Sequence, residues 1–194
     1  MISAFSTAYF PSVSYLKAFC EAENPVIDLG AQCTKQTERM RASILTANGI
    51  QKLSVPIIRP NGNKTATKDI QISFVESWER DHCRAIKAAY SSSPYFEDYS
   101  DTIFDLINSK EESLFKFNQL ILNKIIEWLD LPIQQNFQLV YIDNPTQDYR
   151  EFDFNIEESK YQQVEFGQKG FTPNLSILDA IFCLGPMARK LIIS

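Results

Sequence analysis

Histidine is the scarcest chemically versatile residue in this 194-residue chain, which contains only His82. The four cysteines, Cys20, Cys33, Cys83 and Cys183, show no CxxC or CxxxC spacing. A Cys/His zinc site needs several ligands of these types at close spacing, so the sequence predicts no metal site. Scattered cysteines are typical of small buried side chains in a reducing compartment, and we therefore expect a cytoplasmic protein.

Long apolar runs and nucleotide-binding loops are also missing. No apolar run reaches the roughly 18 residues that a transmembrane helix needs, so we expect no membrane span. The first residues lack a positively charged region before an apolar one, so we also expect no signal peptide. The chain contains no GxGxxG loop, no Walker-type loop and no serine in a nucleophile-elbow pattern. The sequence leaves the cofactor and any metal requirement open.

Positive charge is in short supply in the second half of the chain. The net charge is −5, but residues 1–90 have a balance of +3 and residues 91–194 one of −8. A protein that binds duplex nucleic acid usually has a dense basic face, so this distribution argues against a nucleic-acid partner. It is compatible with a small anionic ligand held by the first half.

The length and ordinary composition predict a single domain over residues 1–194. Hydrophobic periodicity and turn residues divide it into strands and helices. We expect strands at 1–10, 26–29, 69–75 and 137–142, a hairpin at 41–57, and helices at 12–22, 78–90, 95–108, 113–131 and 174–182. The fold class is therefore α/β or α+β: an N-terminal strand–helix–strand and β-hairpin sheet packed against a mostly helical C-terminal half. Residues 144–159 are acidic and predicted to be irregular.

The segment 34–57 combines positive charge with the strongest hairpin signal. Lys35, Arg39 and Arg41 precede an alternating apolar pattern that is interrupted by Asn48-Gly49. These cations can form a fork for phosphate or carboxylate, because guanidinium binds such groups bidentately. The alternative is a solvated charged face before an ordinary hairpin.

Two residues on predicted helices have a catalytic and a structural interpretation. His82 lies one helical turn after Trp78 and would serve any imidazole acid–base step; alternatively it faces the core with a satisfied ring nitrogen. Asp179 either orients a partner or packs a helix, bonded to a backbone amide or an arginine. We expect Asn174 or Thr172 to cap the helix that carries it.

Two further features of the sequence each have a functional and a structural interpretation. Asp28, in a predicted strand, is either a buried carboxylate paired with Lys35 or Arg39 or an aspartate at the surface edge of the sheet. The aromatic residues around the helix break at 91–94 either pack in the core or form a wall against which a ligand stacks. They are Tyr90, Tyr95, Phe96 and Tyr99.

Segments along nearly the whole chain together resemble the WbqC-like family of bacterial surface-polysaccharide locus proteins. The carrying residues are Tyr9-Phe10-Pro11, Lys35-Gln36, Arg39, Arg41, Ala47-Asn48-Gly49, Leu53-x-Val55-Pro56-Ile57, Trp78-x-x-x-His82, Tyr90, Pro94-Tyr95-Phe96, Tyr99, Asn118, and Gly170-Phe171-x-Pro173-Asn174 through Asp179. The chain departs from the pattern at Thr34 and Met40, where we expect an aromatic residue and an asparagine, and before Tyr161, where a proline is absent.

The resemblance implies a transferase of O-antigen biosynthesis that moves a glycyl or similar acyl group to an amino sugar, free or linked to a nucleotide. His82 would be the base, assisted by Asp28. The residues expected to bind a sugar or sugar-phosphate substrate are Tyr9, Lys35, Arg39, Arg41, Trp78, Tyr95, Asn118 and Asp179. The alternative is a non-catalytic protein that binds sugar phosphates or assists assembly in a polysaccharide pathway. The oligomeric state is left open.

Overall fold

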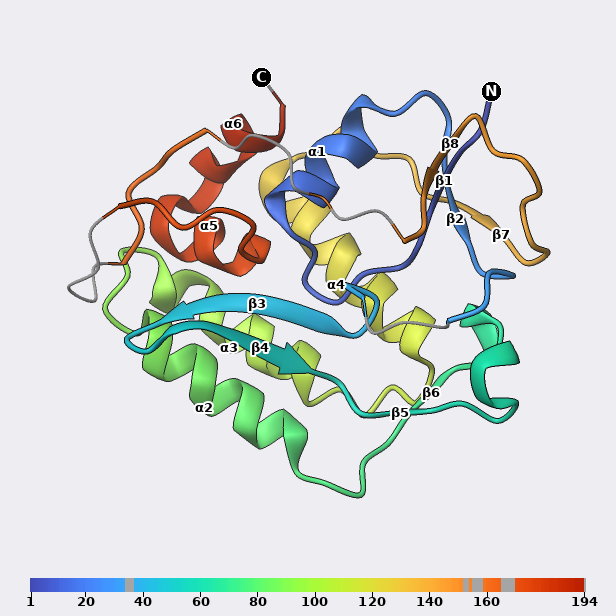
Figure 1. Cartoon of the computed structure of the whole chain (residues 1–194). Coiled ribbons are helices and arrows are strands. Elements are labelled where there is room, and N and C mark those ends of the chain that lie inside the picture. The colour runs from blue at the N-terminus through green and yellow to red at the C-terminus, as the bar shows by residue number, and fades with distance from the viewer. Residues whose placement is uncertain (34–36, 152–153, 155–158, 165–169, 194) are drawn as a thin grey trace.

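The computed structural model describes residues 1–33, 37–151, 154, 159–164 and 170–193. The chain has a mixed α/β fold, as predicted: a small parallel sheet and a β-hairpin are held together by helices (Figure 1). Among the described residues, no helix is both long and apolar enough to cross a membrane.

The parallel sheet lies at one end of the molecule, on the right in Figure 1. Its order is β7-β2-β1-β8, and each neighbouring pair of strands is parallel. Helix α1 connects β1 to β2, which confirms the predicted strand–helix–strand unit. The central strand β1 is buried at all three positions, as expected for a parallel strand covered on both faces. The elements are β1 (Ser3–Phe5), α1 (Val13–Glu21), β2 (Pro25–Asp28), β7 (Asn136–Gln138) and β8 (Gln147–Tyr149).

The predicted hairpin is present as an antiparallel pair. Thr46 pairs with Gly49 at the turn, and Gly49 has a φ of 97°, which a glycine adopts without steric cost. The strands are β3 (Arg41–Thr46) and β4 (Gly49–Ser54). A second antiparallel pair of strands follows, with two residues in each strand and two short 3-10 helices between them. These elements are β5 (Ile57–Ile58), η1 (Gly62–Lys64), η2 (Thr67–Asp69) and β6 (Gln71–Ile72).

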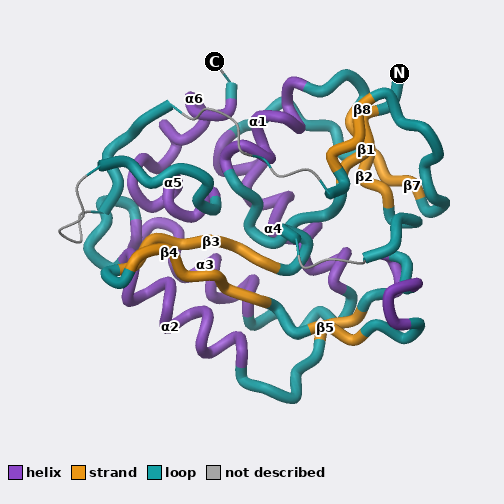
Figure 2. Tube along the Cα trace, viewed as in Figure 1, coloured by secondary structure: helices purple, strands orange, loops and turns teal. Residues whose placement is uncertain are grey.

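The long helices follow the hairpin between residues 78 and 129, and the last helices lie between 177 and 192, whereas the described residues of 130–176 contain no helix (Figure 2). The longest helix, α4, begins at a Ser113 cap, whose hydroxyl accepts from the amide of Lys116, and ends at Asp130 in the left-handed conformation. Helices α2 and α3 lie beside the hairpin, and α4 passes through the middle of the molecule and ends beside α6, where Nη1 of Arg189 donates to the carbonyl of Leu129 (Figure 1). The helices are α2 (Trp78–Tyr90), α3 (Phe96–Ile107), α4 (Leu114–Leu129), α5 (Ile177–Leu184), η3 (Gly185–Ala188) and α6 (Arg189–Ile192).

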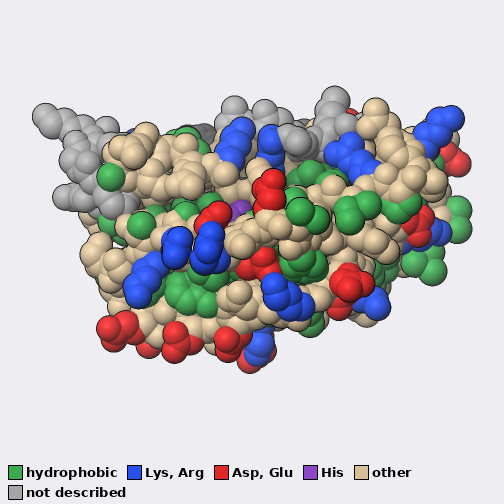
Figure 3. Space-filling view, turned by 90° about the horizontal axis from the view of Figure 1, so that it is seen from below, with side chains coloured by type: hydrophobic (Ala, Val, Ile, Leu, Met, Phe, Trp, Pro, Cys, Tyr) green, Lys and Arg blue, Asp and Glu red, His purple; other side chains and the backbone are tan. Residues whose placement is uncertain are grey.

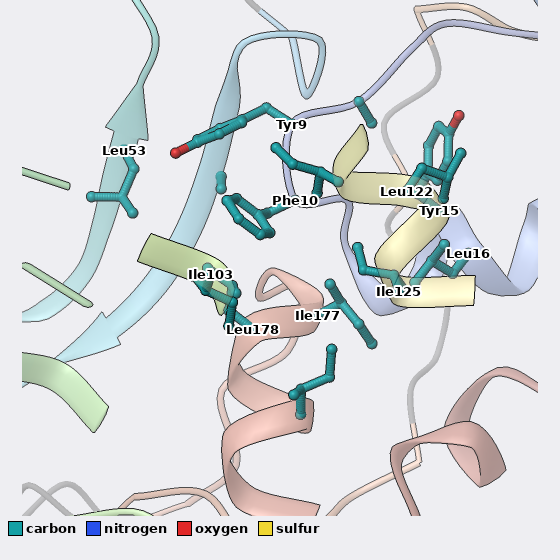
Figure 4. Close-up of a cluster of buried hydrophobic side chains, with 14 of the residues drawn as sticks. Tyr9, Phe10, Tyr15, Leu16, Leu53, Ile103, Leu122, Ile125, Ile177 and Leu178 are labelled. Atoms are coloured by element: carbon teal, nitrogen blue, oxygen red, sulfur yellow. The ribbon is translucent and has the colours of Figure 1, made fainter. Parts of the chain in front are cut away.

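The hydrophobic core links the hairpin, the helices and the sheet. Tyr9 and Phe10, on the segment after β1, project between the hairpin and helix α5 (Figure 4). The predicted aromatic cluster belongs to this core, because Tyr90 and Phe96 pack on Phe182 with ring centroids 5.1 and 5.3 Å apart. The core-packing interpretation of that cluster is therefore the one the structure supports.

Three predicted strands are shorter than their apolar patterns suggest, and the one predicted for 69–75 is reduced to β6 (Gln71–Ile72). The strand predicted for 1–10 ends at Phe5, because the following residues leave the sheet to fill the core and Phe10 has a φ of 40°. The strand predicted for 137–142 ends at Gln138, and the chain then turns so that the amide of Ile142 reaches the Asp28 carboxylate instead of a neighbouring strand. The apolar residues after Phe5 are buried in the core and those at 139–141 are exposed, and neither group continues its strand.

Two boundaries in the last third of the chain also differ. The segment predicted to be irregular, 144–159, contains β8, an edge strand of the sheet. Helix α5 begins after Ser176, whose hydroxyl accepts from the amide of Leu178. Asn174 does not cap this helix; it lies two residues earlier with a φ of 59°.

Candidate functional site

A cleft of about 720 Å³ lies at the carboxyl end of the parallel sheet. Ligands of open α/β sheets bind at this end, because the loops that follow the strands converge there. The cleft is built from segments that follow β2 and β7, from the end of β8, and from the segment before β3. Its lining residues are Gly30, Ala31, Gln32, Arg39, Tyr141, Asp148, Arg150 and Glu151.

Asp28, the last residue of β2, holds the floor of the cleft together. Its side chain is completely buried. Oδ1 accepts from the amides of Gly30 and Ala31, and Oδ2 accepts from the amide of Ile142 and from Nη1 of Arg150 at 2.8 Å. A buried carboxylate with four donors is fully engaged in the structure. Its geometry is that of a residue that fixes loops.

Of the two alternatives for Asp28, the structure has the buried, paired carboxylate and not the aspartate at the surface edge, but the partner differs from those expected. Arg150, not Arg39, forms the ion pair. Lys35, the other predicted partner, lies outside the described residues. Arg150 follows β8 and is separated from Asp28 by 122 residues, so local spacing in the sequence contains no sign of the pair.

Arg150 is held from several sides. Nε and Nη2 donate to the two oxygens of Asp148, Nη1 also donates to the carbonyl of Ile142, and the guanidinium lies 4.5 Å from the centre of the Tyr141 ring. The hydrogen bonds with Asp148 raise the pKa of Arg150. The same bonds lower the pKa of the Asp148 carboxyl. Arg150 and Asp148 therefore stay charged and fixed in the wall of the cleft.

Gly30 lets the loop after β7 approach the floor of the cleft. A Cβ at this position would lie 2.2 Å from the backbone nitrogen of Tyr141 and 2.4 Å from the carbonyl carbon of Val140. Such distances are far below van der Waals contact with backbone atoms that cannot swing away. Only glycine therefore permits this arrangement of the two loops.

Arg39 is the cation of the cleft with hydrogen-bonding capacity left over. It is 1% exposed, and burial lowers its pKa. Nη1 donates to Oγ1 of Thr37 at 3.3 Å, whereas Nε is buried and finds no hydrogen-bond partner among the described residues. Its carbonyl accepts from Nδ2 of Asn118 on α4 at 2.8 Å. Asn118 thus positions the backbone of Arg39 and does not itself line the cleft.

His82 lies in the core, away from the cleft lining. Nδ1 is 2.8 Å from the Tyr9 hydroxyl, the Ser54 backbone provides a second hydrogen bond, and the Trp78 ring packs edge-on at 5.0 Å. Burial lowers the pKa of His82 to about 4, against the opposing effect of the Ser54 bond. The structural alternative stated for this histidine fits these contacts: Tyr9, Trp78 and His82 form one buried group between the first loop and α2.

The other predicted substrate-binding residues are dispersed. Arg41 lies on β3, where Nε donates to Oγ of Ser54 at 3.1 Å, and does not line the cleft with Arg39. Tyr95 is the residue before α3, and its ring packs against Gly185, which follows α5. The structure thus separates Arg39 from Arg41, and the predicted fork of the two is not formed in the described residues.

Asp179 belongs to a separate polar group near α5. It is fully buried, and burial raises its pKa. Oδ2 accepts from the Tyr161 hydroxyl at 2.7 Å and from Nε2 of Gln163 at 3.1 Å. Its partners are side chains, whereas the helix-packing interpretation named a backbone amide or an arginine.

Sequence reasoning identified Arg39 but missed Tyr141, Asp148, Arg150 and Glu151. One signal was available: Asp28-Leu29-Gly30 ends a predicted parallel strand, which is where α/β sheets bind ligands. The residues on the other side of the cleft follow β8, and that strand was not predicted. Among the described residues, no group of three or more His, Cys, Asp or Glu side chains is placed to hold a metal ion.

The surface view in Figure 3 shows lysine and arginine side chains interspersed with aspartate and glutamate. That face does not have the dense positive charge that phosphate-backbone binding uses.

The chain was compared with protein families, with known proteins and with solved structures. The model of the WbqC-like protein family matches residues 7–148. The uncharacterized protein Rv1507c of Mycobacterium tuberculosis is 22% identical over 222 residues, which cover 96% of this chain and 95% of that protein. No solved structure matches the chain significantly. The matched range includes Arg39 and Asn118 and ends at Asp148, so Arg150 and Glu151 lie just beyond it.

Proposed function

The chain belongs to the WbqC-like protein family, and from this premise we propose that it binds a sugar phosphate, free or linked to a nucleotide, in the cleft at the carboxyl end of its sheet. The pathway we propose is bacterial surface-polysaccharide biosynthesis, which the family resemblance implies. The cleft volume of about 720 Å³ lies within the roughly 300–1,000 Å³ typical of small-molecule sites.

One observation carries this proposal: the buried Nε of Arg39 has no hydrogen-bond partner among the described residues. Leaving a buried donor of a charged group unpaired is costly, and such groups in native proteins are normally satisfied. A phosphate or carboxylate satisfies a guanidinium with two parallel charge-assisted hydrogen bonds. Because burial lowers the pKa of Arg39, a bound anion would also offset the cost of keeping this charge away from water.

A second candidate function is transfer of a glycyl or similar acyl group to an amino sugar. In this reaction the acceptor nitrogen attacks the carbonyl carbon of the donor, the C–N bond forms, the bond to the leaving group breaks, and the nitrogen loses a proton. Of the two carboxylates that line the cleft, Asp148 has both oxygens bonded to Arg150, which leaves Glu151 as the carboxylate to take the proton. We propose Glu151 for this role in place of His82, whose ring hydrogen bonds are both made within the core.

The test is isothermal titration of purified protein with sugar phosphates, nucleotide sugars and the corresponding neutral sugars. We expect sugar phosphates to bind and neutral sugars not to bind. Arg39→Gln should abolish binding, and Arg80→Gln, which removes an exposed arginine on α2, should leave it unchanged.

If Arg39→Gln does not fold, Arg39→Lys provides the same information. It keeps the charge but loses the bidentate geometry, and we expect affinity to fall about tenfold. Unchanged affinity in a folded Arg39 variant would place the site elsewhere. For the transfer reaction, an acyl donor and an amino sugar are added and the acylated product is sought by mass spectrometry.

A further inference from the structure

The cleft is lined by positively and negatively charged side chains, and some of them are already paired with other groups of the protein. Arg150 donates to Asp28, Asp148 and the carbonyl of Ile142. Its charge is therefore balanced by two carboxylates of the protein itself. Among the described residues that line the cleft, Arg39 is the cation whose hydrogen-bonding capacity is left for a ligand.

On the acidic side, Asp148 and Glu151 both line the cleft. Asp148 is half exposed, with a side-chain accessibility of 50%, although both its oxygens accept from Arg150. Its pKa is lowered by those bonds, so it remains a carboxylate at neutral pH. Glu151 is exposed, and its charge reaches Arg39 electrostatically. Because the charge of Asp148 is paired with Arg150, a ligand that carries only negative charge would meet Arg39 favourably and Glu151 unfavourably.

Resting on the proposed function, we infer that the cleft selects a sugar phosphate that also bears a primary ammonium group. The phosphate is held by Arg39, and the ammonium is held by Glu151 with Asp148 beside it. Two observations support this assignment independently: the unpartnered Nε of a buried arginine, and the carboxylates that line the same cleft. The opposite charges of such a ligand match those of the cleft, which gives specificity by repelling purely anionic competitors.

The experiment compares glucosamine 1-phosphate with glucose 1-phosphate, which has a hydroxyl in place of the ammonium, and with N-acetylglucosamine 1-phosphate, in which a larger acetamido group replaces the ammonium and carries no charge. Their dissociation constants are measured by titration calorimetry with the full chain at neutral pH. We expect glucosamine 1-phosphate to bind about tenfold more tightly than the other two, because a hydrogen bond between two charged groups contributes more than a neutral one.

Two matched variants assign the preference. Glu151→Gln removes one charge without changing the shape of the side chain, and we expect it to reduce the preference for the amine to about threefold or less. It should leave glucose 1-phosphate bound at least as tightly as before, because a repelling charge has been removed. Glu97→Gln, an exposed carboxylate on α3, should leave the preference intact.

The outcomes separate the two proposals. Equal binding of the three phosphates by the unmodified chain overturns the selectivity but supports the phosphate site. An amine preference that survives Glu151→Gln overturns the assignment to Glu151. If none of the phosphates binds, the proposed function itself fails, and the selectivity falls with it.

Discussion

Nη1 of Arg150 lies 2.8 Å from Oδ2 of Asp28, and both side chains are buried. The pair joins the carboxyl ends of β2 and β8, which are separated in the sheet by β1. A single ion pair therefore fixes the two sides of the cleft relative to each other. The same carboxylate also holds the amides of two loops, so the pair is part of a larger buried network.

Asp28→Ala should lower the free energy of unfolding by about 3–5 kcal/mol, because it leaves three buried amides without an acceptor and removes the buried one of the two carboxylates that balance the Arg150 charge. Urea denaturation followed by circular dichroism measures the change. Glu127→Ala, which removes an exposed ion pair with Lys124, is the control and should cost no more than about 1 kcal/mol. A similar small effect for Asp28→Ala would contradict the network described for this residue.

His82 should make the stability of the protein dependent on pH between about 6.5 and 4. Burial lowers its folded-state pKa to about 4, whereas the unfolded chain has the ordinary value near 6.5. In this window the unfolded state binds more protons than the folded state. The contribution of His82 to the free energy of unfolding is therefore fully present above pH 6.5 and is lost as the pH falls toward 4. The contribution of His82 to this loss is about 3 kcal/mol.

The measurement compares unfolding at pH 7 and pH 4.5 for the natural chain and for His82→Gln, which cannot titrate. The variant should lose less stability between the two values. Because the chain has one histidine, the imidazole resonances in an NMR titration report His82 directly. A midpoint near 6.5 in the folded protein would show that the ring is not buried as described.

Gly30→Ala should destabilise the protein by about 1–3 kcal/mol and disturb the cleft, because the added Cβ collides with the backbone of Tyr141 and Val140. Gly62→Ala is a suitable comparison: Gly62 has a φ of 55° but open space around it. That substitution should cost only the conformational penalty of about 1–2 kcal/mol. Thermal unfolding gives the stabilities, and phosphate binding reports the cleft. Normal binding in Gly30→Ala would mean that the loop after β7 does not shape the site.

Local patterns predicted the parts of this fold that depend on local interactions. The Asn48-Gly49 hairpin and the long helices were found because turn residues, caps and apolar periodicity act within a few residues. Strand β8 was missed because its three residues, Gln147–Tyr149, are polar or aromatic and gain strand structure only by pairing with β1. Short edge strands of this kind have little pattern of their own.

Only the part of the cleft formed by residues before β3 and after β2 was predictable from sequence, because the other part depends on the pairing of β8 with β1. Arg39 is recognisable as part of a cationic segment, although its burial and its separation from Arg41 are set by tertiary packing. Arg150 and Glu151 are brought to the cleft by β8, and the partner of Arg150 lies 122 residues away in the chain. His82 shows the converse: a scarce residue on an apolar helix face can be identified from sequence, but its contacts decide whether it packs or reacts.

The pairing of β1 with β8 also determines when during folding the cleft can form. Ser3 aligns with Gln147, so the ribosome must release most of the chain before the first strand acquires its last neighbour. Pairings between such distant segments form slowly, whereas the hairpin and the helices form from neighbouring residues. Ligand binding therefore reports completion of the fold: a chain arrested with its helices and hairpin formed but β8 undocked would have a core and no cleft.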